Sequence, residues 1–197
     1  MERRTAVMVD FTGTSRKVLP DWVPQELERA EIDLVLRECS TTEELSAHAG
    51  DADFVWVMGG GRVCRTSSLE VLKRCGAIVR TGSGTDNIDV EAATRLGIVV
   101  ANTPDALADD VADHAIGLLF AVIRLIPQQD ALVRQGRWDR KMDSYRWHLK
   151  GQTLGIVGFG LIGRTVARKM SGFEMEILVF DPYVDEKLCA GLGAAHE

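Results

Sequence analysis

The stretch from Thr153 to Asp181 constrains the fold more than any other part of this sequence. It reads TLGIVGFGLIGRTVARKMSGFEMEILVFD, in which an apolar run leads into Gly158, Gly160 and Gly163. A helix-like segment follows, and a second apolar run then ends on Asp181. This succession predicts a strand, a glycine-rich turn, a helix and a second strand, which is the pattern of a dinucleotide-binding unit.

Each part of this pattern has a mechanical reason. Gly158 allows a tight turn out of the strand, Gly160 allows a pyrophosphate to approach the backbone, and Gly163 allows the helix to pack closely on the strand. The free N–H groups at the helix start attract phosphates. A carboxylate at Asp181 can accept hydrogen bonds from the adenosine ribose and repel a 2′-phosphate, which favours NAD over NADP.

Two other interpretations of the glycine-rich stretch remain open from the residues alone. One is a glycine-rich turn in an unrelated α/β protein. The other is the cofactor loop of a methyltransferase, which tolerates an acid after the second strand but usually has a looser glycine pattern.

The first hundred residues alternate between strand-like and helix-like segments. This alternation predicts an α/β fold with a parallel sheet covered on both faces. Two capping boxes, at Thr41–Glu44 and Ser67–Glu70, mark helix starts, and we expect the second helix to run to about Arg74. The expected strands are Ala6–Val9, Ile32–Leu36, Phe54–Val57, Ala77–Arg80 and Ile98–Ala101.

Pro104 interrupts this alternation and predicts a domain boundary, with one domain at residues 1–103 and the other at 104–197. We expect Asp109 or Asp110 to cap a long helix from Val111 to about Ile126, stopped by Pro127 and buried on most faces. A further helix is expected to run to Gln135. After Gly151 only two strands are evident, so the dinucleotide domain is expected to be incomplete.

Composition excludes several classes of function. The net charge is −6 and there is no basic block, which argues against nucleic-acid binding. The longest apolar run, Ala115–Ile123, is short for a membrane span, and the first residues show no signal peptide. The four cysteines have no metal-ligand spacing and are expected to be reduced thiols, so we expect a cytoplasmic protein without a metal site.

Five further motifs resemble the D-isomer-specific 2-hydroxyacid dehydrogenase family, in its phosphoglycerate-dehydrogenase-like and glyoxylate–hydroxypyruvate-reductase-like branches. The family pattern G-x-G-x-D-N-(I/V)-D is followed by VEAA, NTP, V-A-(E/D)-H-A and R-x-G-x-W before the nucleotide-binding stretch. The matching segments here are Gly82–Asp89, Val90–Ala93, Asn102–Pro104, Val111–Ala115, Arg134–Trp138 and Lys150–Tyr183.

The resemblance implies a flavodoxin-like substrate domain followed by the first part of a Rossmann NAD-binding domain. The backbone of Gly82, Ser83 and Gly84 would bind the substrate carboxylate. Val111 would lie near the nicotinamide. The remaining residues implied in NAD binding are Gly158, Phe159, Gly160, Leu161, Ile162, Gly163, Asp181, Pro182 and Tyr183, although the family often has Arg or Asn in place of Leu161.

The implied activity is hydride transfer between NAD(H) and a 2-hydroxy or 2-oxo acid, in a homodimer formed through the NAD-binding domains, with Val111–Lys150 as the expected interface. The family's catalytic Arg, Glu and His match no position in these residues. We therefore expect the 197-residue chain to be a fragment without turnover of its own. The alternative is a non-catalytic NAD(H)-binding or co-repressor-like scaffold module.

Overall fold

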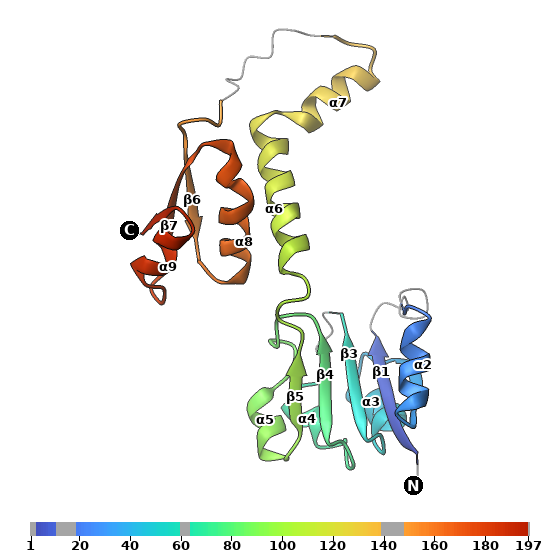
Figure 1. Cartoon of the computed structure of the whole chain (residues 1–197). Coiled ribbons are helices and arrows are strands. Elements are labelled where there is room, and N and C mark those ends of the chain that lie inside the picture. Colours follow the sequence, from blue (N-terminus) through green and yellow to red (C-terminus); the bar gives the residue numbers. More distant parts are fainter. Residues whose placement is uncertain (1–2, 11–18, 60–63, 139–147, 197) are drawn as a thin grey trace. The chain divides into compact units, whose positions relative to one another are not determined.

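The chain folds into two compact units (Figure 1). The computed structural model describes residues 3–10, 19–59, 64–138 and 148–196. The first unit is Met1–Ala106 and the second is Leu107–Glu197. Residues 139–147 of the expected dimer interface lie outside the described part of the chain. The assignment of residues 1–103 to substrate binding and 104–197 to NAD binding stays a prediction.

The first unit is built on a five-stranded parallel sheet with the strand order β2-β1-β3-β4-β5 (Figure 1). This is the flavodoxin-like order, in which ligands bind beyond the carboxyl ends of the strands. The predicted α/β class and parallel sheet are therefore confirmed. The strands are β1 (Arg4–Asp10), β2 (Ile32–Glu38), β3 (Phe54–Met58), β4 (Ala77–Thr81) and β5 (Val99–Asn102).

Short helices connect these strands and complete an apolar core around Val55, Val57 and Ile78. The capping box at Thr41 is confirmed, because the Glu44 N–H donates to Thr41 Oγ1 and the Thr41 N–H donates to Glu44 Oε2, both at 3.2 Å. The helices are α2 (Trp22–Arg29), α3 (Thr42–Ala49), α4 (Thr66–Leu69) and α5 (Val90–Arg95).

The helix expected from Ser67 to Arg74 is wrong in both its start and its end. Helix α4 begins at Thr66 and ends at Leu69. The Ser68 hydroxyl accepts a hydrogen bond from the Arg65 N–H and donates one to the Arg65 carbonyl, each at 2.9 Å. Ser68 therefore caps the helix from inside its first turn, and Ser67 is not the cap.

The second unit contains a three-stranded parallel sheet with the order β6-β7-β8, not the two strands expected. The third strand was missed because it is three residues long and consists of Ala194, Ala195 and His196, which have little intrinsic strand preference. Its pairing with β7 supplies the missing stabilisation. The other elements are β6 (Thr153–Val157), α8 (Leu161–Met170), η1 (Ser171–Phe173), β7 (Glu176–Phe180) and α9 (Glu186–Gly191).

Two further helices of this unit, α6 (Ala108–Ile123) and α7 (Ile126–Arg134), precede the sheet in sequence (Figure 1). Helix α6 begins before Asp109 and Asp110, so these residues lie in its first turn and do not cap it. Negative charge is favourable there because of the helix dipole. Pro127 lies at the start of α7, where its missing N–H costs nothing, and it does not end α6.

The expectation that α6 is buried on most faces is wrong. Ala112 is its buried residue, whereas Leu118 is 54% and Val122 69% exposed. Helix α6 packs on α8, and the rings of Phe120 and Phe173 lie 5.1 Å apart, but these contacts cover only one side of the helix. Its apolar character is therefore not explained by packing within the described residues.

No helix in the described ranges has both the length and the apolar character needed to cross a membrane on its own. The pair α6 and α7 reaches those limits only when taken together, and the two helices are bent by 64° relative to each other.

Candidate functional site

The glycine-rich loop joins β6 to α8 in the second unit, as the sequence predicts. Gly158 has a φ of 92°, a conformation that a residue with a side chain adopts only under strain, and its N–H donates to the Phe180 carbonyl at 2.9 Å. Gly160 is the N-cap of α8. The loop thus ends β6 with a tight turn and directs the first turn of α8 toward the carboxyl edge of the sheet, where phosphates bind in such folds.

Gly163 lies at the closest approach of α8 to the loop. A Cβ built there would stand 3.2 Å from the Gly158 carbonyl carbon and 3.3 Å from Ile156 Cγ2, and still closer to the Gly158 carbonyl oxygen. Real Cβ atoms essentially never approach a backbone oxygen so closely. The predicted packing role of Gly163 is therefore confirmed by the geometry.

Asp181 and Phe159 connect the loop to the end of β7. The Phe159 N–H donates to Asp181 Oδ2 at 2.6 Å, and the Tyr183 N–H donates to Asp181 Oδ1 at 2.9 Å. The Phe159 side chain is completely buried in the core of this unit. Sequence reasoning missed this bracing role of Asp181.

The other residues implied in NAD binding are exposed. Leu161 and Ile162 lie in the first turn of α8, and Val111 lies in α6 with 43% of its surface exposed. Pro182 is exposed and Tyr183 is 94% exposed. Their apolar surface is thus available to a planar ligand such as an adenine ring, whereas Gly158, Gly160 and Gly163 offer backbone.

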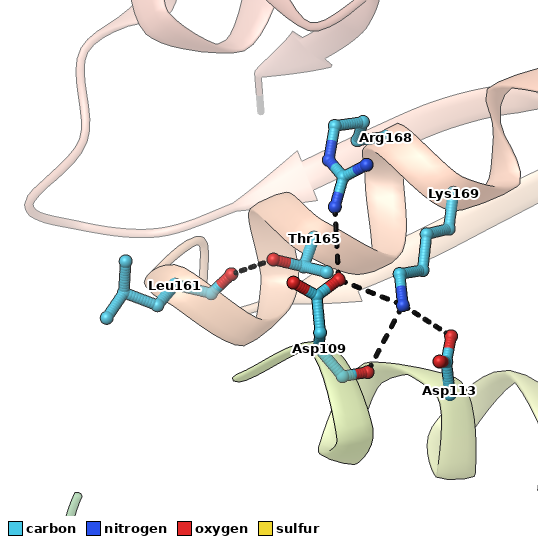
Figure 2. A network of polar contacts seen from close by, with 6 residues as sticks. All are labelled: Asp109, Asp113, Leu161, Thr165, Arg168 and Lys169. Carbon is cyan, nitrogen blue, oxygen red and sulfur yellow. Dashed lines mark hydrogen bonds and ion pairs between the residues drawn. The ribbon is translucent and has the colours of Figure 1, made fainter. Parts of the chain in front are cut away.

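A group of charged residues, called here the Lys169 network, fastens α6 to α8 (Figure 2). The Lys169 ammonium donates to Asp113 Oδ1 at 2.5 Å and to the Asp109 carbonyl oxygen at 3.2 Å, and it lies 2.9 Å from Asp109 Oδ1. Arg168 Nη2 also donates to Asp109 Oδ1, at 3.2 Å. Asp109 and Asp113 are four residues apart on one helix face, a spacing that could have predicted a shared cation.

The Lys169 network stays charged over a wide pH range. Hydrogen bonds to Asp113 and Asp109 raise the pKa of Lys169 above its ordinary value of 10.5. The hydrogen bond from Lys169 lowers the pKa of Asp109 below its ordinary value of 3.8. The contribution of Asp109 to stability is therefore lost only in acid, and that of Lys169 only in strong alkali.

The predicted substrate loop follows β4 in the first unit. Gly82 is buried and has a φ of 133°, whereas Ser83 and Gly84 are exposed. The Arg80 guanidinium lies against the loop, because a Cβ on Gly82 would come within 2.5 Å of Arg80 Nη1. Arg80 Nε donates in turn to Asn87 Oδ1 at 3.3 Å. The loop therefore presents the Ser83–Gly84 backbone at the carboxyl edge of the sheet, with a cation beside it.

The four cysteines and the possible metal ligands form no metal-binding group in the described residues. All four cysteines are free and buried, and burial raises the pKa of Cys64 to about 12, so the thiol form persists at neutral pH. No group of three or more His, Cys, Asp or Glu residues in the described ranges is arranged to hold a metal ion.

A family model, described as the D-isomer specific 2-hydroxyacid dehydrogenase catalytic domain, matches residues 15–193. The chain is 42% identical over 153 residues to the D-3-phosphoglycerate dehydrogenase of Methanocaldococcus jannaschii, a match covering 78% of this chain and 29% of that protein. It is also 42% identical over 146 residues to the glyoxylate reductase of Pyrococcus furiosus, which covers 70% of this chain and 43% of that protein.

Among solved structures, the chain is similar to apo D-lactate dehydrogenase from Escherichia coli, with a TM-score of 0.76 and 25% identity. That match covers 98% of this chain and 60% of the solved chain. The chain therefore spans less than half of the two relatives described above and about three fifths of this solved structure.

Proposed function

Because the chain belongs to the D-isomer specific 2-hydroxyacid dehydrogenase family, we propose that it binds NAD(H) and serves hydride transfer to or from a 2-hydroxy or 2-oxo acid. The observation that carries the cofactor part is the loop Gly158–Gly163 with Asp181 at its side. The exposed backbone of the loop and the start of α8 can recognise a pyrophosphate, and the Asp181 carboxylate can recognise an unphosphorylated ribose.

Two loops bind the two ligands: Gly158–Gly163 binds the cofactor, and Gly82–Gly84 binds the substrate. The α8 helix start holds the pyrophosphate, Asp181 accepts hydrogen bonds from the ribose hydroxyls, and Val111 limits the space beside the nicotinamide. The nicotinamide, when bound, supplies the hydride acceptor or donor. The Ser83 and Gly84 N–H groups bind the substrate carboxylate and thereby orient the carbon that exchanges the hydride.

The alternative function is that of a non-catalytic NAD(H)-binding or scaffold module. It is supported by the loop Gly158–Gly163 at the start of α8, because a module that only binds NAD(H) needs this loop as much as an enzyme does. Both functions require NADH binding. Formation of NADH from NAD and a 2-hydroxy acid would establish the dehydrogenase, and in the 197-residue chain it would also contradict the expectation of no turnover.

Asp181→Ala tests the cofactor assignment. We expect NADH to bind about tenfold more weakly, because charge-assisted hydrogen bonds to the ribose and the brace to Phe159 are both lost. NADPH affinity should fall less, since the variant no longer repels a 2′-phosphate. Fluorescence titration with both nucleotides gives the ratio of affinities.

The matched control for this experiment is Asp185→Ala. It removes a nearby carboxylate that accepts from the Leu188 N–H at the start of α9 and does not brace the loop. The control should keep the wild-type preference for NADH. An unchanged NADH-to-NADPH ratio in Asp181→Ala contradicts the ribose assignment.

We further propose that a second copy of the chain covers the exposed side of α6 and α7. The supporting observation is the row of exposed apolar side chains there, since a patch of this kind usually marks an interface. It consists of Leu118, Val122, Ile126 and Val133.

Leu118→Glu should shift the chain from dimer to monomer, because the substitution places a charge in an apolar interface. Light scattering over a range of concentrations measures the mass. Gln128→Glu, an exposed polar position on α7, is the control and should remain associated. A wild-type chain that is monomeric at every concentration refutes the interface.

A further inference from the structure

The loop Gly82–Gly84 is fastened to the last residue of β5 and to the two residues that follow this strand. The Gly82 N–H donates to Thr103 Oγ1 at 2.8 Å, and the Thr103 N–H donates back to the Gly82 carbonyl at 3.1 Å. The Asn102 amide donates to the Ser83 carbonyl at 2.7 Å, and the Ser83 hydroxyl donates to the Pro104 carbonyl at 2.9 Å. Four hydrogen bonds thus join two short segments that are about twenty residues apart.

These bonds continue the pairing of the two strands beyond its regular end. The β4–β5 ladder closes with Arg80 opposite Asn102, and Gly82 and Thr103 lie just past that pair. In a regular ladder the partners would be backbone groups on both sides. Here the Thr103 side chain accepts the Gly82 N–H, so the chain can turn at Gly82 with its φ of 133° and still satisfy this buried donor.

The same bonds determine which donors the loop can offer. The Gly82 N–H already donates to Thr103 Oγ1, and the Ser83 hydroxyl already donates to the Pro104 carbonyl. In the part of the chain that the structure describes, the Ser83 and Gly84 N–H groups have no acceptor. Two successive backbone N–H groups of exposed residues are thereby left for a ligand, an arrangement that suits a carboxylate.

We propose that Thr103 and Asn102 are positioning residues that hold the Ser83 and Gly84 N–H groups in the orientation needed to bind a substrate carboxylate. This role rests on the proposed function of the loop. Thr103 acts by fixing Gly82, the residue that precedes the two donors in the chain. Asn102 acts by fixing the Ser83 carbonyl, which lies between the Ser83 and Gly84 N–H groups along the backbone. Neither side chain has to touch the substrate.

Thr103→Val tests the proposal because it keeps the shape of the side chain and removes the acceptor. The experiment uses the 15N-labelled 197-residue protein and glycolate, the simplest 2-hydroxy acid, and follows the amide signals of Ser83 and Gly84. We expect glycolate to shift both signals in the wild type and to bind about tenfold more weakly in Thr103→Val, the effect of one lost hydrogen bond. Asn102→Ala should weaken binding in the same direction.

Two further variants separate positioning from general damage. Thr103→Ser retains the hydroxyl acceptor and should restore glycolate binding. Thr94→Val removes an exposed hydroxyl that donates to the Val90 carbonyl in α5 and should bind glycolate as the wild type does. A merely structural role would not give this split between the valine and serine variants.

Each outcome has a distinct meaning. Glycolate binding that is unchanged in Thr103→Val and Asn102→Ala, or equally weak in Thr103→Ser and Thr103→Val, overturns the positioning role and leaves the loop assignment standing. Wild-type protein in which glycolate shifts neither Ser83 nor Gly84 refutes the substrate loop itself, and the positioning role with it.

Discussion

Gly163→Ala is expected to destabilise the second unit by about 2–3 kcal/mol and to abolish measurable NADH binding. The added methyl group would overlap the Gly158 carbonyl, which is backbone and cannot rotate away as a side chain could. Helix α8 would have to move off the end of β6, and the helix start would lose its place beside the loop. Both effects come from one displacement, so stability and binding should fall together.

Hydrogen exchange of the β6 and β7 amides measures the stability of this unit by itself, and NADH fluorescence measures binding. Gly172→Ala is the matched control, because no atom lies within 4 Å of a Cβ at that position. It should leave exchange and binding unchanged. If Gly163→Ala protects the strand amides as well as the wild type does, the packing role of Gly163 is wrong.

The glycine-rich loop was predictable from sequence because its requirements are local. The glycines, the flanking apolar runs and the closing acid lie within one strand–helix–strand segment, and each has a single geometric purpose. The capping box of α3 was predictable for the same reason, since Thr41 and Glu44 satisfy each other within one turn.

Features that depend on distant partners were not predictable in this way. The fastening of Gly82 by Thr103 joins residues on separate strands, and the Lys169 network joins two helices far apart in sequence. The apolar composition of α6 was correctly recognised, but composition does not say whether a face packs inside the chain or stays exposed. The short strand β8 was missed because pairing with β7, and not its own residues, stabilises it.

Gly160→Ala should have the opposite profile to Gly163→Ala: an intact fold with weak cofactor binding. Gly160 has φ −69° and ψ −161°, a backbone conformation open to alanine, and its Cβ would meet no protein atom within 4 Å. Exchange of the strand amides should therefore stay within about 0.5 kcal/mol of the wild type. The methyl group would instead occupy the space into which the proposed pyrophosphate fits.

We expect NADH affinity to fall on the order of tenfold to a hundredfold in Gly160→Ala, the cost of overpacking or of a displaced phosphate. Adenosine, which has no pyrophosphate, should bind as it does to the wild type, because Asp181 and Tyr183 are untouched. An equal loss for adenosine and NADH would mean that the methyl group disturbs the loop and not the phosphate. Unchanged NADH binding would mean that nothing approaches the backbone at Gly160, and the proposed pyrophosphate site would then be wrong although the fold around it is correct.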